Sequence, residues 1–125
     1  MNINDRLKNY RKGRNCTLLG VGPMSKNCVD ATIELASQHQ APIMLIASRR
    51  QIDSEEFGGG YVENWSTKEF AEYVRKNDVE KNVLLARDHG GPWQNELEKT
   101  QKMSLDDAMQ SAKASYKADI DAGFH

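Results

Sequence analysis

Apolar residues gather in three short runs, at positions 17–22, 43–47 and 83–86, and each run is followed by a more polar stretch. The middle run, Ile43–Ala47, has no polar position at all. A strand without polar alternation is typical of a parallel sheet that helices cover on both faces. We therefore predict three buried parallel strands, starting near residues 17, 42 and 82.

A segment with helical periodicity follows each predicted strand. A serine that can cap a helix stands before each of these segments: Ser25, Ser66 and Ser104. In the last segment one face of the predicted helix is lined by apolar residues, namely Leu105, Met109, Ala112 and Tyr116. A short amphipathic helix over residues 3–14 is expected outside the main body. Three strand–helix units in succession predict an α/β fold.

Chemistry in such a fold is expected where the strands end, because ligands of parallel α/β sheets bind beyond the carboxyl ends of the strands. Three loops meet this condition, at residues 22–25, 48–51 and 87–91. They lie far apart in the sequence, but they converge if the three strands are neighbours.

Asp88 and His89 form the sharpest candidate within these loops. A carboxylate serves as a general acid or base, and an imidazole binds a divalent metal or transfers protons. Both side chains can reach one site if the backbone turns after the strand, and Gly90 and Gly91 allow such a turn without steric strain. The alternative interpretation is that Asp88 caps the loop and His89 bonds locally.

Ser48, Arg49 and Arg50 are candidate phosphate ligands, because guanidinium groups form paired hydrogen bonds to phosphate. Gly90 and Gly91 complete this candidate set for phosphate or substrate. The alternative is a surface arginine pair bonded to nearby acids, namely Asp53, Glu55 or Glu56.

Gly58, Gly59 and Gly60 form a further candidate loop. Their spacing matches neither glycine-rich fingerprint of nucleotide-binding loops. We interpret them as a flexible active-site loop or a simple turn.

Composition narrows the function classes. The 125 residues include 17 basic and 18 acidic side chains, for a net charge of −1, which gives no general attraction to nucleic acid or to anionic lipid. No apolar run approaches the ~20 residues of a membrane-spanning helix. Cys16 and Cys28 form neither a disulfide framework nor a metal-binding pair. We expect a cytoplasmic protein with no nucleic-acid or membrane partner.

Four segments, taken in order, resemble a known family. They are residues 20–26 (GVGPMSK), 42–48 (PIMLIAS), 57–61 (FGGGY) and 86–93 (ARDHGGPW). This pattern resembles the non-catalytic (accessory) subunit family of D-tagatose-1,6-bisphosphate aldolase, which is related to class II, zinc-dependent sugar-bisphosphate aldolases. The resemblance covers roughly residues 15–124.

The resemblance implies a TIM (β/α)8 barrel of which this chain holds only the amino-terminal part. Residues 1–125 would then form a single amino-terminal fragment of such a barrel, with an N-terminal helix over residues 1–15 and three βα units over residues 16–125. It also implies support of the aldol cleavage of a ketose bisphosphate to dihydroxyacetone phosphate and glyceraldehyde 3-phosphate, within carbohydrate metabolism.

The resemblance further assigns Asp88 as the acid/base carboxylate and His89 as one zinc ligand of the complete enzymes. The remaining ligands of a three-ligand zinc site do not occur in this chain, so we expect it to bind no zinc and to show no aldolase activity alone. The implied partner is an aldolase catalytic subunit or a second copy of this chain, with a phosphorylated sugar as ligand. The alternatives are a catalytic metal-dependent aldolase of the same group, and a stand-alone α/β phosphate-binding or interaction module.

Overall fold

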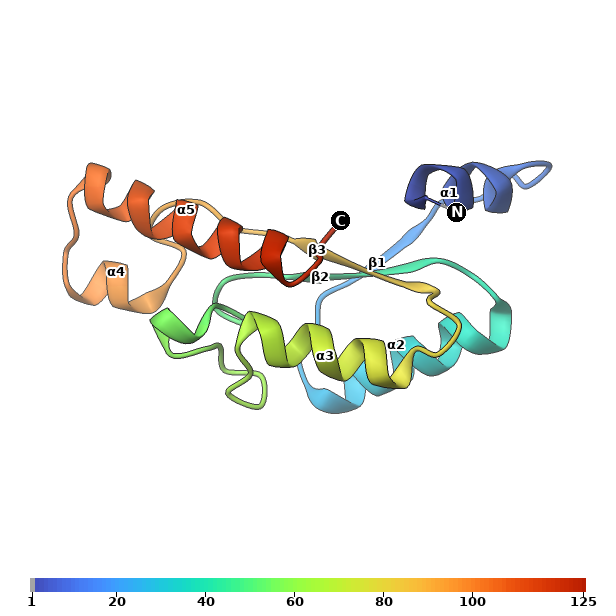
Figure 1. Cartoon of the computed structure of the whole chain (residues 1–125), viewed down its shortest axis with the longest axis horizontal. Coiled ribbons are helices and arrows are strands. Elements are labelled where there is room, and N and C mark those ends of the chain that lie inside the picture. Colours follow the sequence, from blue (N-terminus) through green and yellow to red (C-terminus); the bar gives the residue numbers. More distant parts are fainter. Residues whose placement is uncertain (1) are drawn as a thin grey trace.

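A three-stranded parallel sheet forms the centre of the computed structural model, which describes residues 2–125 (Figure 1). Its strands are β1 (Leu19–Val21), β2 (Ile43–Ala47) and β3 (Val83–Arg87), and they lie in the order β1-β2-β3. The central strand β2 pairs in parallel with both neighbours. The predicted α/β class and the three parallel strands are confirmed. The predicted burial is wrong for β1, in which Leu19 and Gly20 are exposed and Val21 is only partly buried.

The helices alternate with the strands as the periodicity predicts. They are α1 (Ile3–Arg11), α2 (Lys26–His39), the 3-10 turn η1 (Glu55–Phe57), α3 (Thr67–Asn77), α4 (Glu96–Thr100) and α5 (Leu105–Asp121). Ser25, Ser66 and Ser104 each accept a hydrogen bond from the backbone of the first turn, so the three predicted caps are present. The short helix α4 lies between the predicted loop at residues 87–91 and the last predicted helix, and it was not predicted.

One face of the sheet carries the core. Helices α2 and α3 run side by side beneath the strands in Figure 1, and α3 also contacts α5. Leu45 of β2, Val29 of α2 and Phe70 of α3 are fully buried between these layers. Trp65 covers the edge of this core, with its ring 5.9 Å from the ring of Phe70 and 4.8 Å from that of Tyr73.

The predicted burial of β2 on both faces is wrong. Its side chains alternate, with Ile43, Leu45 and Ala47 buried and with Met44 and Ile46 partly exposed. An apolar strand therefore lies in a sheet whose second face is only partly covered. The described residues form an open three-stranded sheet, and the barrel implied by the family resemblance is not evident in it.

The apolar face of α5 that the sequence predicts is not the face that the helix buries, apart from Ala112. The residues that α5 buries are small or polar: Ala108, Ala112, Ser115 and Asp119. Leu105, Met109 and Tyr116 are exposed instead. Small side chains let α5 approach the body closely, and its buried polar residues bond to partners inside. Within residues 2–125, no helix is both long enough and apolar enough to cross a membrane.

Phe70 lies at the centre of the core, so we expect the removal of its ring to lower the stability of the protein strongly. Phe70→Ala removes a fully buried side chain from α3, so it is expected to lower the free energy of unfolding by about 3–5 kcal/mol. Urea unfolding followed by circular dichroism measures this loss. Tyr61→Ala, at a side chain with 60% exposure, serves as control and should change stability by less than about 0.5 kcal/mol. Equal losses in the two variants would contradict the assigned core.

Candidate functional site

The three loops that follow the strands lie beside one another. The backbone N–H of Asp88 donates to the carbonyl of Ala47 at 2.9 Å, which joins the loops after β3 and β2. The backbone N–H of Ser48 donates to Oε1 of Gln51 at 2.9 Å, and a Cβ placed on Gly22 would lie 3.4 Å from Nε2 of the same glutamine. The topology thus brings all three loops to the carboxyl edge of the sheet.

Asp88 and His89 are both exposed at this edge. The Asp88 carboxylate accepts a hydrogen bond from the backbone N–H of His89 at 2.9 Å, and its other oxygen lies 3.6 Å from Nε2 of the imidazole. His89 has φ of 44°, so the chain turns sharply there. This geometry matches the local bonding that the sequence left open.

The zinc ligand set implied by the family resemblance does not fit these residues. Within residues 2–125, no three or more His, Cys, Asp or Glu side chains are grouped so that they could hold a metal ion. Asp88 and His89 supply two groups, whereas a catalytic zinc site takes three protein ligands.

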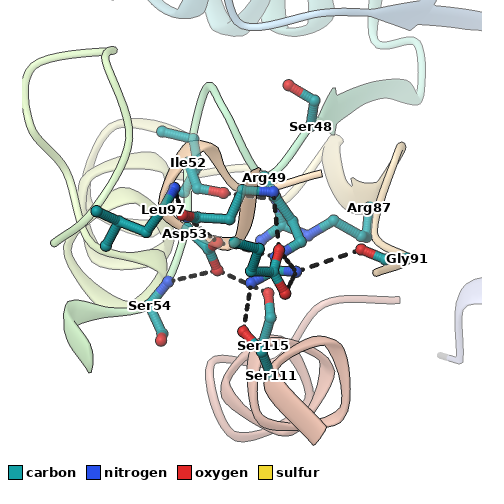
Figure 2. A network of polar contacts seen from close by, with 12 residues as sticks. Ser48, Arg49, Ile52, Asp53, Ser54, Arg87, Gly91, Leu97, Ser111 and Ser115 are labelled. Carbon is teal, nitrogen blue, oxygen red and sulfur yellow. Dashed lines mark hydrogen bonds and ion pairs between the residues drawn. The ribbon is translucent and has the colours of Figure 1, made fainter. Parts of the chain in front are cut away.

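The neighbouring residues Ser48, Arg49 and Arg50 separate into two environments. Ser48 is partly exposed, and its hydroxyl points away from the interior polar network drawn in Figure 2. Arg50 is half exposed and lies 3.3 Å from the exposed carboxylate of Glu96. Arg49 lies in the interior with no exposed surface. Only Ser48 and Arg50 are therefore open to a ligand from solvent.

The Arg49 guanidinium donates to four protein groups (Figure 2). Nε donates to Asp53 at 2.9 Å, and Nη1 donates to both oxygens of Glu98 at 2.9 and 3.0 Å. Nη1 also donates to the carbonyl of Gly91 at 3.2 Å, and Nη2 donates to Ser111 at 3.2 Å. Because each of its nitrogens already donates within the protein, Arg49 is placed to fix these segments rather than to meet a phosphate.

Asp53, one of the acids that the sequence offered as a partner, receives further donors. The Asn95 side-chain amide donates to Oδ2 at 2.9 Å, and the Ser115 hydroxyl donates to Oδ1 at 2.7 Å. The backbone N–H of Ser54 also donates to Oδ1, at 2.9 Å. Such donors stabilise a carboxylate that has lost its water. We name the set of Arg49, Asp53, Asn95, Glu98 and Ser115 the buried arginine network.

A second buried ion pair lies beside this network. Arg87, the last residue of β3, donates to both oxygens of Asp119 on α5, at 2.8 and 2.6 Å. Its Nη1 also donates to the carbonyls of Ala47 and Ile52, at 3.1 and 2.6 Å. This guanidinium therefore ties the end of β3 to the loop after β2 and to the final helix.

The three glycines at 58–60 form a packed turn. Gly58 and Gly59 have φ of 82° and 72°, which favours glycine. A Cβ on Gly60 would lie 1.9 Å from the carbonyl oxygen of Gln51, so no larger residue fits between these two backbones. The next residue, Tyr61, donates its backbone N–H to the Arg50 carbonyl at 2.9 Å. The turn is thus held against the 50–52 segment.

Gly90 and Gly91 have separate structural roles. A Cβ on Gly90 would lie 2.5 Å from the hydroxyl oxygen of Tyr116, so close packing requires glycine there. Gly91 provides the carbonyl that Arg49 binds. Both glycines help to seat the loop after β3 on α5.

A cavity of about 460 Å³ brings several candidate residues together. It lies between the glycine turn and the start of α4, and it is lined by Arg49, Arg50, residues 57–61 and residues 95–97. We name it the Arg50 cavity. A larger cavity, of about 550 Å³, lies between α3 and α5 and contains none of the candidate residues.

Two shifted pKa values belong to a group of three side chains that joins α2 to α3: Lys26, Asp30 and Tyr73. We name this group the α2–α3 clamp. A hydrogen bond from Lys26 to Asp30, at 2.8 Å, raises the pKa of Lys26 and lowers the pKa of Asp30. The Tyr73 hydroxyl also donates to Asp30 and adds to both shifts. This clamp holds the start of α2, directly after the first loop, against α3.

Sequence reasoning missed Glu98 of α4 as a partner of Arg49, Asn95 as a partner of Asp53, and Asp119 of α5 as the partner of Arg87. Asn95 and Glu98 form a capping box at the start of α4, a pattern that is visible in the sequence as Asn-x-x-Glu. Asp119 follows Ser115 by four residues, which places both on the buried side of α5. The capping box was the one available signal, and it would have identified α4.

Comparison with known proteins gives a match to a solved structure. No family model matches the chain, and neither does any curated protein. The chain is similar to the crystal structure of a probable tagatose 6 phosphate kinase from Sinorhizobium meliloti 1021, with 25% sequence identity and a TM-score of 0.58. The match covers 77% of this chain but only 24% of the kinase chain. This chain therefore corresponds to about a quarter of that protein.

This match contradicts the predicted membership of the aldolase accessory-subunit family. The similar protein is described as a probable kinase, and no family model or curated protein carries the aldolase assignment. The predicted support of aldol cleavage is wrong for the same reason. The motifs behind the resemblance are short and rich in glycine and proline, and turns of many families use such residues.

The buried arginine network predicts a large loss of stability when Arg49 is replaced and a small one when the adjacent Arg50 is replaced. Arg49→Met leaves Asp53 and Glu98 as buried carboxylates without their cation, so it is expected to lower the free energy of unfolding by about 3–5 kcal/mol. Arg50→Met breaks only an exposed pair and should cost about 0–1 kcal/mol. Chemical denaturation of both variants provides the measurement. A loss for Arg49→Met as small as that for Arg50→Met would show that the network contributes little.

Proposed function

We propose that this chain binds a phosphorylated sugar in the Arg50 cavity and acts in carbohydrate metabolism. The observation that carries the proposal is the joint placement of Arg50 and the glycine turn in one cavity of about 460 Å³. Small-molecule sites occupy about 300–1,000 Å³, and the Arg50 cavity falls within this range. Arg50 and the glycine turn were candidates from the sequence, and Arg50 is half exposed.

The residues that line the cavity can bind both the phosphate group and the sugar ring of such a ligand. Arg50 carries a guanidinium whose partner Glu96 is itself exposed, so a phosphate can replace that weak pairing with two parallel hydrogen bonds. Glu96 is then free to accept hydrogen bonds from sugar hydroxyls. The exposed ring of Tyr61 offers an apolar surface to the sugar ring. Arg49 and Asn95 contribute a wall that the buried arginine network holds in place.

The similar protein supports the same ligand class, since its description names tagatose 6 phosphate. We take tagatose 6-phosphate as the probe for this reason. Phosphoryl transfer is a property named for that protein, of which this chain matches 24%. The proposal for this chain is therefore binding of the sugar phosphate. Asp88 and His89 lie outside the residues that line the Arg50 cavity, and their roles in proton transfer and zinc binding stay predictions.

Titration calorimetry with tagatose 6-phosphate tests the proposal. The unmodified chain is expected to bind this ligand more tightly than free tagatose, because the phosphate supplies the charge-assisted hydrogen bonds. Arg50→Gln should weaken binding by about tenfold or more, since a hydrogen bond to a charged group contributes ~1.5–3 kcal/mol.

Two further variants serve as controls in the same titration. Arg11→Gln removes an exposed arginine from α1, outside the Arg50 cavity, and should leave binding unchanged. His89→Ala should also leave it unchanged. A loss confined to His89→Ala would move the site to the Asp88–His89 edge, and equal affinity for tagatose and its phosphate would refute phosphate recognition.

A further inference from the structure

Helix α5 has an apolar surface that the rest of residues 2–125 leaves largely open, although the end of the Tyr116 side chain packs beside Gly90. Four of the large hydrophobic side chains that remain exposed lie on this helix: Leu105, Met109, Tyr116 and Ile120. At about 100° per residue, these positions fall within one narrow stripe along the helix. We name it the α5 stripe. Ile120 is the most exposed of the four, with 74% of its surface open.

The stripe is distinct from the surface by which α5 joins the body. Ala108, Ala112, Ser115 and Asp119 are the buried side of the helix, and the centre of the stripe lies roughly a quarter turn away from them. A helix in a soluble protein ordinarily keeps one apolar stripe, and that stripe faces its core. Here the core-facing side is small and polar, and the larger apolar residues face outward. Exposed apolar patches of this kind mark interaction sites.

We propose that the α5 stripe binds the α5 stripe of a second copy of this chain in an antiparallel pair. The spacing of the stripe is self-complementary. In such a pair Leu105 lies opposite Ile120 of the second copy, and Met109 lies opposite Tyr116, because both pairs are centred between positions 112 and 113. A two-fold axis at this centre repeats each contact, as an isologous dimer requires.

Charge along one border of the stripe fits the same arrangement. Asp106 and Lys117 lie on this border, each close to the apolar residues on the helical wheel. In the antiparallel pair Asp106 lies about 3 Å along the helix axis from the position of Lys117 of the second copy, which is within reach of this long side chain. Lys117 also pairs with Asp121 of its own helix, at 2.6 Å. The two-fold symmetry makes the contact between copies twice. A parallel pair in register would instead place like charges together, aspartate beside aspartate and lysine beside lysine. The charges therefore favour the antiparallel direction.

Lys113 lies beside the two-fold axis, where the two copies bring like charges together. Its methylene groups can lie along the stripe while its ammonium group reaches water, so it limits affinity without preventing contact. One helix pair is a small interface, because α5 has 17 residues and is about 25 Å long. Small interfaces of this kind give weak dimers.

Sedimentation equilibrium of the whole chain over a range of concentrations, from about 1 to about 500 µM, covers the affinity expected for a small interface. A monomer–dimer equilibrium is expected. Met109→Glu should abolish it, and Lys113→Met should tighten it, because the like charge at the axis is removed. A chain that stays monomeric throughout this range overturns the proposal.

A charge exchange tests the direction of the pair. Asp106→Lys alone and Lys117→Asp alone should each weaken the dimer, and the double variant should restore it, since the two opposite charges are exchanged together. Circular dichroism of each variant establishes that the fold is kept. Association that persists in Met109→Glu, or a double variant weaker than both single variants, overturns antiparallel pairing through α5.

Discussion

The placement of one guanidinium inside the protein governs how its carboxyl edge is built. Removing Arg49 from water is costly unless its donors find acceptors in the fixed planar geometry of the group. The acceptors come from parts of the chain that are distant in sequence: Asp53 follows β2, Glu98 belongs to α4, and Ser111 belongs to α5. Satisfying this one side chain therefore brings the second loop and the last two helices together. Arg87 likewise forms a buried, hydrogen-bonded ion pair with Asp119, closer to the sheet.

The two adjacent arginines have different roles: Arg49 supports the wall of the cavity, and Arg50 is available to contact a ligand. Arg49 is withdrawn from solvent and holds the wall of the cavity, whereas Arg50 stands at its mouth with an exposed carboxylate beside it. The contacts of Arg49 hold the adjacent backbone in place, so the position of Arg50 is already fixed when a ligand binds to it. Binding sites gain affinity when the protein orders such groups in advance, because less conformational freedom is lost on binding.

The parts of the fold that depend on local pattern could be predicted from the sequence. The strand over Ile43–Ala47 and the helix cap at Ser66 are local signals, and both occur where they were expected. The depth of Arg49 depends on acceptors up to 62 residues away, which no local pattern reveals. The orientation of α5 could not be predicted for a related reason, since burying Ser115 and Asp119 is favourable only once Asp53 and Arg87 face them. Of the candidate site, the convergence of loops followed from the topology, whereas the cavity beside Arg50 required the position of α4.

The two tryptophans stand in contrasting places, and this gives the protein two optical reporters. Trp65 lies within the aromatic cluster of Phe70 and Tyr73, so its emission follows the packing of the core. Trp93 is exposed, and its indole N–H donates to the carbonyl of Met103 at 3.1 Å, across the loop that carries α4. Replacing either residue by phenylalanine leaves a single tryptophan, whose emission then reports on one place. The opening of the α4 loop and the melting of the hydrophobic interior can then be followed as separate spectroscopic events.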